Sequence, residues 1–316
     1  MRNNLARTMN KVIKNKIEQL HHLYKDLSLE NKDVLHQIAL AEIPEMVYNS
    51  NAIENSTLTL EDTEQILIEG IVPKKANTRE VYEAKNLAKI TEFLLNNPNK
   101  TLSVSLILDL HKILLSDIED NIAGRFRQGR EWVRVGNHLG ANPLFVGSLM
   151  KELVENYNAE KQAYFLDNIA RFHAEFETIH PFCDGNGRMG RVIINQQLTK
   201  LGYPPIIIQN KSKIKEYYAL FTHYPSNMKF GGFTSLFAVL LLESLHKRLT
   251  LLTARRIIPL SLWAKQNAVK GNIAANKAKR QTIPAFRLRE KWVISESYRE
   301  DSDIFEFFHG EINLKK

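Results

Sequence analysis

A twelve-residue stretch, HPFCDGNGRMGR at positions 180–191, gathers many chemically active side chains in one place. The glycines of DGNG permit a tight turn that presents successive backbone N–H groups to an anion. We expect a helix to begin at once with RMGRVIINQQL, so that its N-terminal N–H groups and dipole face the same anion. Arg188 and Arg191 are three residues apart and can lie on one side of that helix. This combination favours a polyphosphate over a single carboxylate.

His180 and Asp184 supply the remaining chemistry of this stretch. A histidine can accept a proton near pH 7, and a carboxylate beside phosphates is a natural ligand for Mg²⁺. Together the side chains indicate nucleotidyl or phosphoryl transfer. A structural His180 and a His180–Asp184 metal pair are the alternatives, but zinc needs more ligands and the arginines would repel a second cation. Cys183 is interpreted as a small packed residue rather than a nucleophile.

A second stretch, SNAIENSTLTLED, lies far upstream of the first one. Ser50 and Glu54 are four residues apart and share a face if this segment is helical. Asn55 follows directly, and STLTLED contains a cap for the next helix. On these residues alone, Glu54 can equally be a solvated helix residue.

The rest of the chain is mostly helical in its apolar spacing. Between 124 and 147 the pattern changes, because REWVRV alternates polar and apolar residues and GNHLGANPLFV contains turn-forming residues, which predicts a β-hairpin or extended flap. The predicted helices are 3–25, 32–48, 60–69, 78–96, 101–116, 148–160, 167–180, 211–223 and 231–254, besides the one that begins in the motif.

The composition is that of an ordinary globular protein of 316 residues, with 44% hydrophobic and 25% charged residues. We expect no membrane span, because no run of 18 apolar residues occurs, and no signal peptide at the basic N-terminus. The single cysteine suits a reducing compartment, so a cytoplasmic location is expected. Residues 246–292 hold twelve Lys and Arg and one acid, within a net charge of +8. A basic segment next to a neutral body suggests a second module that meets a polyanion, although a solvated surface is an alternative.

The 180–191 stretch resembles the signature of the Fic family, His-Pro-Phe-x-Asp/Asn-Gly-Asn-Gly-Arg-x-x-Arg, at every fixed position. The resemblance runs from about residue 43 to 249 and includes ARFHAEFETIHPF and IKEYYALF. It implies an all-α, Fic-type helical bundle with a β-hairpin flap. It also implies an adenylyltransferase that moves AMP from ATP to a Ser, Thr or Tyr hydroxyl of a target protein or of itself.

The resemblance assigns a role to each motif residue. His180 would be the general base, Asp184 would hold Mg²⁺, and the backbone of Gly185, Asn186 and Gly187 would form the anion hole. Arg188 and Arg191 would bind the β- and γ-phosphates. Tyr217 and Tyr218 match a pair that helps enclose the nucleoside, with a partial core role as the alternative. The flap, about 131–146, would align the target backbone by strand addition; its ANPLFV departs from the double proline that is frequent in the family.

The upstream stretch resembles the inhibitory motif of the same family, Ser/Thr-x-x-x-Glu-Gly/Asn, with Ser50, Glu54 and Asn55 at its fixed positions. By this resemblance Glu54 would pair with Arg191 and occupy the site of the γ-phosphate. Some relatives with this glutamate also remove AMP, so a transferase and a bifunctional enzyme both remain open.

The basic segment resembles a small excisionase-like winged helix-turn-helix module. SLWAKQNAV would be its first helix, VKGN the turn and IAANKAKR the recognition helix, with a two-stranded wing turning at Arg289 and Glu290 in IPAFRLREKWVIS. The predicted division is an N-terminal helical region 1–100 with an inhibitory helix around 45–55, a catalytic core 101–255 and the module 256–316. The expected partners are ATP, a target protein, DNA at the module and a second copy of the chain in a homodimer, with no membrane.

Two other functions stay open at this point. The chain can be a DNA-binding regulator in which the Fic body senses ATP, or a transferase that uses another phosphate-containing donor. A guanidinium group at Arg191 favours a triphosphate, because it would be idle with a shorter donor.

Overall fold

The computed structural model describes residues 11–135, 138–221 and 229–313. The start of the predicted helix 3–25, the tip of the flap and the last two residues of the predicted helix 211–223 lie outside these ranges. The described residues divide into two compact units: the first holds 39–203 and 207–234, and the second holds 11–38, 204–206 and 235–313. The division at residues 100 and 256 stays a prediction.

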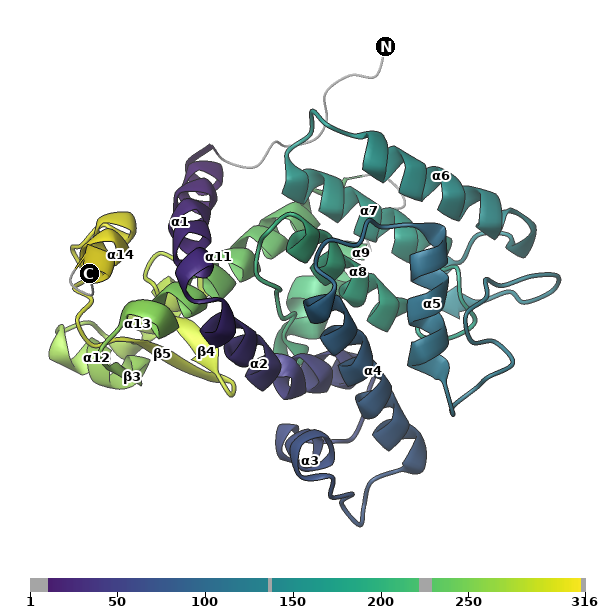
Figure 1. Cartoon of the computed structure of the whole chain (residues 1–316), viewed down its shortest axis with the longest axis horizontal. Helices are drawn as coiled ribbons and strands as arrows, with labels where there is room; N and C mark the ends of the chain where they lie inside the picture. Colours follow the sequence, from purple (N-terminus) through teal and green to yellow (C-terminus); the bar gives the residue numbers. More distant parts are fainter. Residues whose placement is uncertain (1–10, 136–137, 222–228, 314–316) are drawn as a thin grey trace. The chain divides into compact units, whose positions relative to one another are not determined.

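The first unit is helical, as predicted (Figure 1). Polar side chains begin several of its helices: Asn77 accepts from the backbone N–H of Arg79, and Ser103 from that of Leu106. Thr59 forms a capping box with Asp62, which confirms the cap predicted in STLTLED. The helices are α3 (Leu60–Glu64), α4 (Thr78–Asn96), α5 (Val104–Leu115), α6 (Val146–Ala159), α7 (Phe165–Ile179) and α8 (Asn186–Lys200), with a π-helical turn η1 (Gln65–Glu69) after α3.

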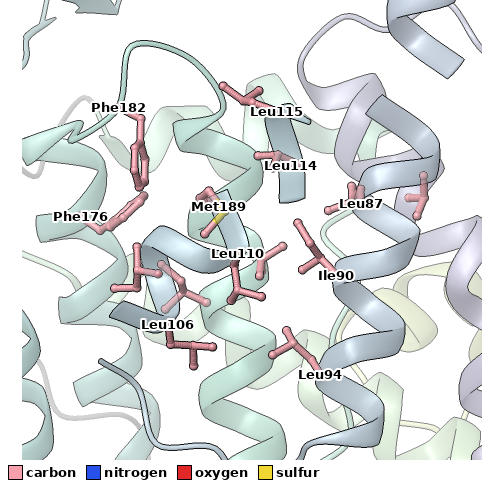
Figure 2. Close-up of a cluster of buried hydrophobic side chains, with 14 of the residues drawn as sticks. Leu87, Ile90, Leu94, Leu106, Leu110, Leu114, Leu115, Phe176, Phe182 and Met189 are labelled. Carbon is pink, nitrogen blue, oxygen red and sulfur yellow. The ribbon is translucent and has the colours of Figure 1, made fainter. Parts of the chain in front are cut away.

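The core of this unit lies where α4 packs on α5 and where α7 packs on α6 and α8. Leucine and isoleucine residues at three- and four-residue spacing on α4 and α5 point toward one another there (Figure 2). Phe182 and Met189, from the 180–191 stretch itself, are fully buried in the same cluster. Burying a side chain of this size contributes about 1.5–3 kcal/mol. Packing of Phe182 and Met189 in the core therefore holds the 180–191 stretch in place.

Helix α2 (Lys32–Ile53) is longer than the predicted 32–48 and continues through Pro44. Its last turns carry buried residues, including Val47, Asn49 and Ile53, so tertiary packing extends the helix beyond its apolar period. Ser50 is consequently helical, and Glu54 lies just beyond the helix end.

The predicted hairpin is present, but its strands are short. Strand β1 (Arg134–Val135) pairs antiparallel with β2 (His138–Leu139), with Val135 opposite His138. A 3₁₀ turn η2 (Pro143–Phe145) follows, because the side chain of Asn142 caps it by accepting from the N–H of Leu144 at 3.1 Å. The ANPLFV end of the flap is thus a helical turn that leads directly into α6.

A helix over 211–223 was predicted, and the described part is helical, but it is not one regular α-helix. The chain forms a 3₁₀ turn η3 (Asn210–Ser212), a π-helix η4 (Lys213–Tyr218) and the short α9 (Ala219–Phe221). The wider π turn allows both adjacent tyrosines to find partners: Tyr217 bonds His173, and Tyr218 bonds the carbonyl of Ile53. Helix α11 (Gly231–Thr253) then confirms the predicted 231–254.

The second unit contains α1 (Lys11–Glu30) and a small three-stranded antiparallel sheet of order β3-β5-β4. The two helices and two strands predicted after Pro259 are present as α12 (Leu260–Gln266), α13 (Gly271–Lys279), β4 (Phe286–Leu288) and β5 (Lys291–Ser295). Strand β3 (Ile257–Pro259) and helix α14 (Ile304–Asn313) were not predicted. Arg289 and Glu290 form the hairpin turn with φ of 47° and 67°, the left-handed backbone that a two-residue turn requires.

No helix in the described ranges is long and apolar enough to cross a membrane.

Candidate active site

His180 caps the C-terminal end of α7 in a left-handed backbone conformation. Its φ is 53°, and its N–H donates to the carbonyl of Phe176 at 2.9 Å. This conformation costs energy for a residue with a side chain and persists only where neighbours enforce it. The sharp turn carries the chain out of α7 and directs the following residues into the loop.

Arg127 enforces that turn. Its guanidinium is buried and donates to four carbonyl oxygens, those of His180 (2.7 Å), Glu131 (2.8 Å), Ala141 (2.8 Å) and Ile179 (3.1 Å). Its backbone N–H also donates to the carbonyl of Pro181 at 2.9 Å. One side chain therefore ties the base of the hairpin to the start of the motif. The sequence offered no signal for this role, because Arg127 lies among other basic residues in GRFRQGR.

The loop itself is closed by Asn186. Its side-chain oxygen accepts from the N–H of Phe182, and its amide nitrogen donates to the carbonyl of Phe182, both at 2.8 Å. Gly185 precedes α8 with φ of 79°, so the helix starts abruptly at Asn186. The first N–H groups of a helix have no intrahelical acceptor, and here they face the loop. The side chain of Asn186 holds the predicted anion nest in shape, and the backbone remains to bind an anion.

His111, which the sequence did not indicate, supports the same loop from α5. Its ring stacks on Phe182 with centroids 3.6 Å apart. The N–H of Gly124 donates to its Nδ1 at 3.0 Å, so Nε2 carries the proton and donates to the carbonyl of Asp184 at 3.1 Å. Burial lowers the pKa of His111 to about 4, against the hydrogen bond to Asp184, so the ring is neutral at pH 7.

The carboxylate of Asp184 is held by two arginines. Arg79 Nη2 donates to Oδ2, while Oδ1 accepts from the N–H of Gly185 at 2.6 Å and from Arg188 Nη2 at 3.3 Å. Arg188 is buried and also lies 3.0 Å from Glu83 Oε1. Arg79 and Glu83 come from the first turns of α4, about a hundred residues upstream, so no spacing in the sequence could indicate them.

Asp184 is the one carboxylate that we expect to coordinate a metal ion at this site. In the ranges that the structure describes, no group of three or more His, Cys, Asp or Glu side chains could hold one. The side chain of Asp184 is 34% exposed and can be reached from solvent. Mg²⁺ commonly binds through one or two carboxylates together with phosphate oxygens and water. Asp184 fits such a metal only in the company of a bound polyphosphate.

Arg191 on α8 is bound by the upstream stretch. Its Nε donates to Ser50 Oγ and its Nη2 to the carbonyl of Ser50, both at 2.9 Å, and Nη2 also donates to Glu54 Oε1 at 2.7 Å. Burial alone would lower the pKa of this guanidinium, but Glu54 and other neighbours raise it, so Arg191 stays charged. The side chain of Arg191 is only 7% exposed, whereas that of Glu54 is 37% exposed, so the contact is half-buried. An ionic contact to a buried guanidinium is stronger than a pair between two surface side chains.

Glu54 lies directly over the anion nest. A Cβ atom at Gly187 would stand 2.3 Å from Glu54 Oε1 and 3.2 Å from Arg191 Nη1. Only glycine at this position allows the carboxylate, or any other anion of its size, to approach the helix start so closely. The first turn of α8 and the guanidinium of Arg191 thus face one anionic group together.

The turn that presents Glu54 depends on Asn55. Its φ of 69° lies in the left-handed region, which asparagine adopts more readily than most side chains. Glu80 on α4 holds the next residues: it accepts from Ser56 Oγ and Thr57 Oγ1, each at 3.0 Å, and from the N–H of Thr57. This gives a physical reason for Gly or Asn after the glutamate.

Tyr217 and Tyr218 have different surroundings. Tyr217 is 2% exposed and its hydroxyl lies 2.9 Å from His173 Nε2, in an aromatic cluster with Phe221 and Phe233. Tyr218 is 39% exposed, and its hydroxyl donates to the carbonyl of Ile53 at 2.9 Å. Only Tyr218 presents a surface that a ligand could contact, while Tyr217 belongs to the core.

Comparisons with known proteins find relatives of part of this chain. Residues 101–198 match the Fic/DOC family model. Over 179 residues the chain is 32% identical to protein adenylyltransferase fic-1 of Caenorhabditis elegans, and over 177 residues it is 32% identical to protein adenylyltransferase Fic of Aedes aegypti. The matches cover 55% and 54% of this chain. They cover 35% of each relative, so the chain spans about a third of their length.

Three solved structures share the fold. A Fic domain-containing signalling protein of Bacteroides thetaiotaomicron matches with a TM-score of 0.66 and 25% identity, over 75% of this chain and 96% of that one. A fragment of C. elegans Fic-1 matches with a TM-score of 0.62 and 26% identity, over 77% of this chain and 73% of that one. A Fic family protein of Desulfovibrio desulfuricans matches with a TM-score of 0.63 and 20% identity, over 91% of this chain and 88% of that one. At this identity the match supports the fold alone. The chain therefore carries a Fic/DOC family domain and is distantly related to the protein adenylyltransferases.

Proposed function

We propose that the protein is an autoinhibited adenylyltransferase that transfers AMP from ATP to a Ser, Thr or Tyr hydroxyl of a target protein or of itself. The observation that carries this proposal is the shared anion site of Gly187 and Arg191, which Glu54 occupies. A site that binds a carboxylate through a helix start and a guanidinium also suits a terminal phosphate.

In this reaction the hydroxyl oxygen attacks the α-phosphorus of ATP. A new P–O bond forms, the bond to the β-phosphate oxygen breaks, and pyrophosphate leaves. His180 takes the hydroxyl proton: its Nδ1 lies 3.3 Å from the carbonyl of Glu177, which can only accept, so Nε2 is the basic nitrogen. The α8 start and Arg188 hold the phosphates in place, and Mg²⁺ bound by Asp184 and phosphate oxygens would reduce their negative charge.

Glu54 inhibits by occupying the position that the γ-phosphate needs. While Arg191 is bound to Glu54 and Ser50, ATP can enter only with its terminal phosphate displaced, and the α-phosphorus is then misplaced for attack. A small displacement is enough, because an error of about 1 Å in the reacting geometry can cost a hundredfold in rate. Withdrawal of Glu54 is therefore the activating step. The same carboxylate could direct water for removal of AMP, as in a bifunctional enzyme.

Labelled ATP tests this proposal. We expect label from the α-phosphate, and none from the γ-phosphate, to become attached to protein. Glu54→Gly should increase this transfer by at least tenfold because Arg191 becomes available, and His180→Ala should abolish it. Transfer of γ-label to protein would rule out the proposed reaction and would indicate a kinase. Equal α-label with His180→Ala and with the wild type would also rule it out. If the enzyme uses a phosphate-containing donor other than ATP, neither label should become attached to protein.

A second function, DNA binding, is favoured by the α12–turn–α13 arrangement followed by the β4–β5 hairpin. Three exposed lysines lie on these elements: Lys270 directly before α13, Lys279 at the end of α13 and Lys291 at the start of β5. Basic side chains on such elements contact phosphates and supply most of the non-specific affinity for DNA. A regulator that binds DNA through this unit and senses ATP through the first one is the corresponding alternative to an enzyme.

A salt titration of duplex DNA binding tests this second function. Replacing Lys270, Lys279 and Lys291 together by Ala should weaken binding and reduce the slope of log affinity against log salt by about one for each phosphate that the variant no longer neutralises. The matched control replaces the exposed lysines 74, 85 and 161 of the first unit, which changes the net charge equally. Equal losses of affinity in both triple variants would show that only overall charge matters and would remove the DNA-binding function.

A further inference from the structure

Glu177 is a buried carboxyl group that the proposed reaction does not use. It lies on the last turn of α7, its side chain is 9% exposed, and its Oε2 is 3.7 Å from His180 Nδ1. Its Oε1 has no hydrogen-bond partner among the described residues. Leaving a buried carboxyl oxygen without a partner costs about 1–3 kcal/mol, so packing gives no reason for an acid here.

The neighbouring helix leaves room for this carboxyl group. A Cβ atom at Gly190 would stand 2.2 Å from Glu177 Oε1 and 3.0 Å from the ring of His173. Gly190 belongs to α8 and lies directly before Arg191. The absence of a side chain on α8 thus allows an acid on α7 to lie between the base and the guanidinium that binds Glu54.

The charged groups around Glu177 come from several elements. Burial raises the pKa of Glu177 to about 8, Arg191 on α8 lowers it, and Glu54 beyond α2 raises it. Burial lowers the pKa of His180 to about 4, and the Glu177 carbonyl acts in the opposite direction. Arg127 and His138, at the hairpin, also lower the pKa of His180, while Glu54 raises it. The phenol of Tyr217 near Glu177 has a raised pKa and stays neutral.

Two ionisable groups this close titrate as a pair. With Glu54 in place, burial raises the pKa of Glu177 to about 8, so the proton of the pair lies on Glu177 at pH 7. Withdrawal of Glu54 removes a like charge and lowers this pKa, which favours the ionised carboxyl group beside His180. With Glu177 neutral, His180 is a weak base, because the imidazolium formed at its ring has no anion beside it. With Glu177 ionised, the pair accepts a proton readily, because the carboxylate faces Nδ1–H of the imidazolium.

We propose that Glu177 is a positioning residue for His180, whose carboxylate holds the imidazolium that forms when His180 takes the hydroxyl proton. This inference rests on the proposed function in taking His180 as the general base. The proton moves from the hydroxyl to Nε2, and Glu177 exchanges none with the substrate. Glu54 then acts in two ways, because it occupies Arg191 and its negative charge also keeps Glu177 protonated.

Titration of the full chain without nucleotide tests this proposal by NMR of ring-labelled histidine. The signal of His180, assigned from its absence in His180→Ala, should respond in two steps, near pH 8 and near pH 4. Glu177→Gln keeps the shape of the side chain but cannot ionise, so the upper step should disappear. Glu54→Gly should move the upper step to lower pH, because a like charge is removed from Glu177.

Further variants keep the result interpretable. Glu177→Asp retains a carboxyl group and should retain an upper step of reduced size. The ring of His246 in the second unit, which lies 2.6 Å from Gln281 Oε1, should titrate identically in every variant and reports whether the chain is folded. An upper step that survives in Glu177→Gln, or is absent from the wild type, overturns the proposal. The titration needs no ATP, so it decides the role of Glu177 even if no AMP transfer is found.

Discussion

Arg127 shows how much of the site depends on a single side chain outside the motif. It is buried, yet no carboxylate of the described residues contacts its guanidinium directly. Carbonyl oxygens from the hairpin, the end of α7 and the loop surround the guanidinium instead. Burial lowers its pKa, but the group stays charged at any relevant pH. Hydrogen bonds from a charged group contribute more than neutral ones, about 1.5–3 kcal/mol each.

Replacing Arg127 by Ala should therefore destabilise the first unit. It leaves four carbonyl oxygens without their donor, and we expect a decrease of about 3 kcal/mol or more in the free energy of unfolding. Urea denaturation monitored by circular dichroism measures this decrease. Arg130→Ala removes the same charge from an exposed site nearby and should change the free energy by less than about 0.5 kcal/mol. A similar small effect in both variants would contradict the structural role of Arg127.

At the residue scale, a sequence allows a prediction where chemically active side chains are concentrated in a short stretch. The types and order of HPFCDGNGRMGR indicate a phosphate site without any coordinates. Arg127, Glu83 and His111 could not be identified in the same way, because each acts through a contact with a residue 50 to 110 positions away. Glu177 lies inside the segment ARFHAEFETIHPF, but a single acid on a helix gives no sign of being buried.

At the element scale, the turn after α2 decides where Glu54 stands. Three features fix it: the left-handed backbone of Asn55, the bonds from Ser56 and Thr57 to Glu80, and the bond from Tyr218 to the carbonyl of Ile53. The cap of α3 was predictable, because Thr59 and Asp62 form a local pattern. The π-helix that carries Tyr218 was not, because no local preference distinguishes it from an α-helix.

Replacing Glu80 by Ala should loosen this turn and raise basal transfer of AMP. Ser56 and Thr57 would no longer have the carboxylate that accepts their hydrogen bonds, so Glu54 should leave Arg191 more often. We expect a two- to tenfold increase in α-label transfer, less than with Glu54→Gly. Glu92→Ala on the exposed face of the same helix serves as the control. Unchanged transfer in Glu80→Ala, with transfer in Glu54→Gly increased, would show that Glu54 is held by Arg191 alone.

At the scale of the whole molecule, four histidines of the described residues couple folding to pH: His111, His173 and His246 are buried, and His180 is largely covered. Burial lowers the pKa of His111 and His180 to about 4, and that of His173 and His246 to about 3. The unfolded chain protonates its histidines near pH 6.5 and so binds more protons than the folded chain below that pH. Their contribution to stability is complete above pH 6.5 and is lost as the pH falls toward 4.

The free energy of unfolding should consequently fall between pH 7.5 and 5. At pH 5 the expected decrease is about 2 kcal/mol per buried histidine, and it can be measured from urea midpoints at a series of pH values. His246→Gln should make the free energy of unfolding of the second unit less dependent on pH, because it removes a histidine with a lowered pKa. Stability that stays constant down to pH 5 would show that these rings are protonated in the folded protein.

The general architecture could be predicted from sequence, because long helices with regular apolar spacing dominate both units. What could not be predicted from local spacing is long-range: the third strand β3, which pairs with β5 across about 35 residues, and the continuation of α2 from residue 48 to Ile53. Both depend on partners far away in the chain and not on local preference. Neither the pairing of β3 with β5 nor the burial of the last turns of α2 produces a periodic pattern of apolar residues in the sequence.

The contact between Glu54 and Arg191 also closes a loop of the chain, because the two residues are 137 positions apart. Removing Glu54 leaves the buried guanidinium of Arg191 without its carboxylate partner. Ordering such a long loop also has an entropic cost that the contact helps to offset. If the proposed function holds, activity and stability are opposed in this fold, because any change that frees Arg191 for ATP also removes a contact between distant segments. A bound triphosphate can restore part of this stability, since a ligand that binds only the folded state stabilises it. On the proposed function, the protein with Arg191 released from Glu54 should therefore depend on bound ATP for its stability, whereas the protein with the contact intact should not.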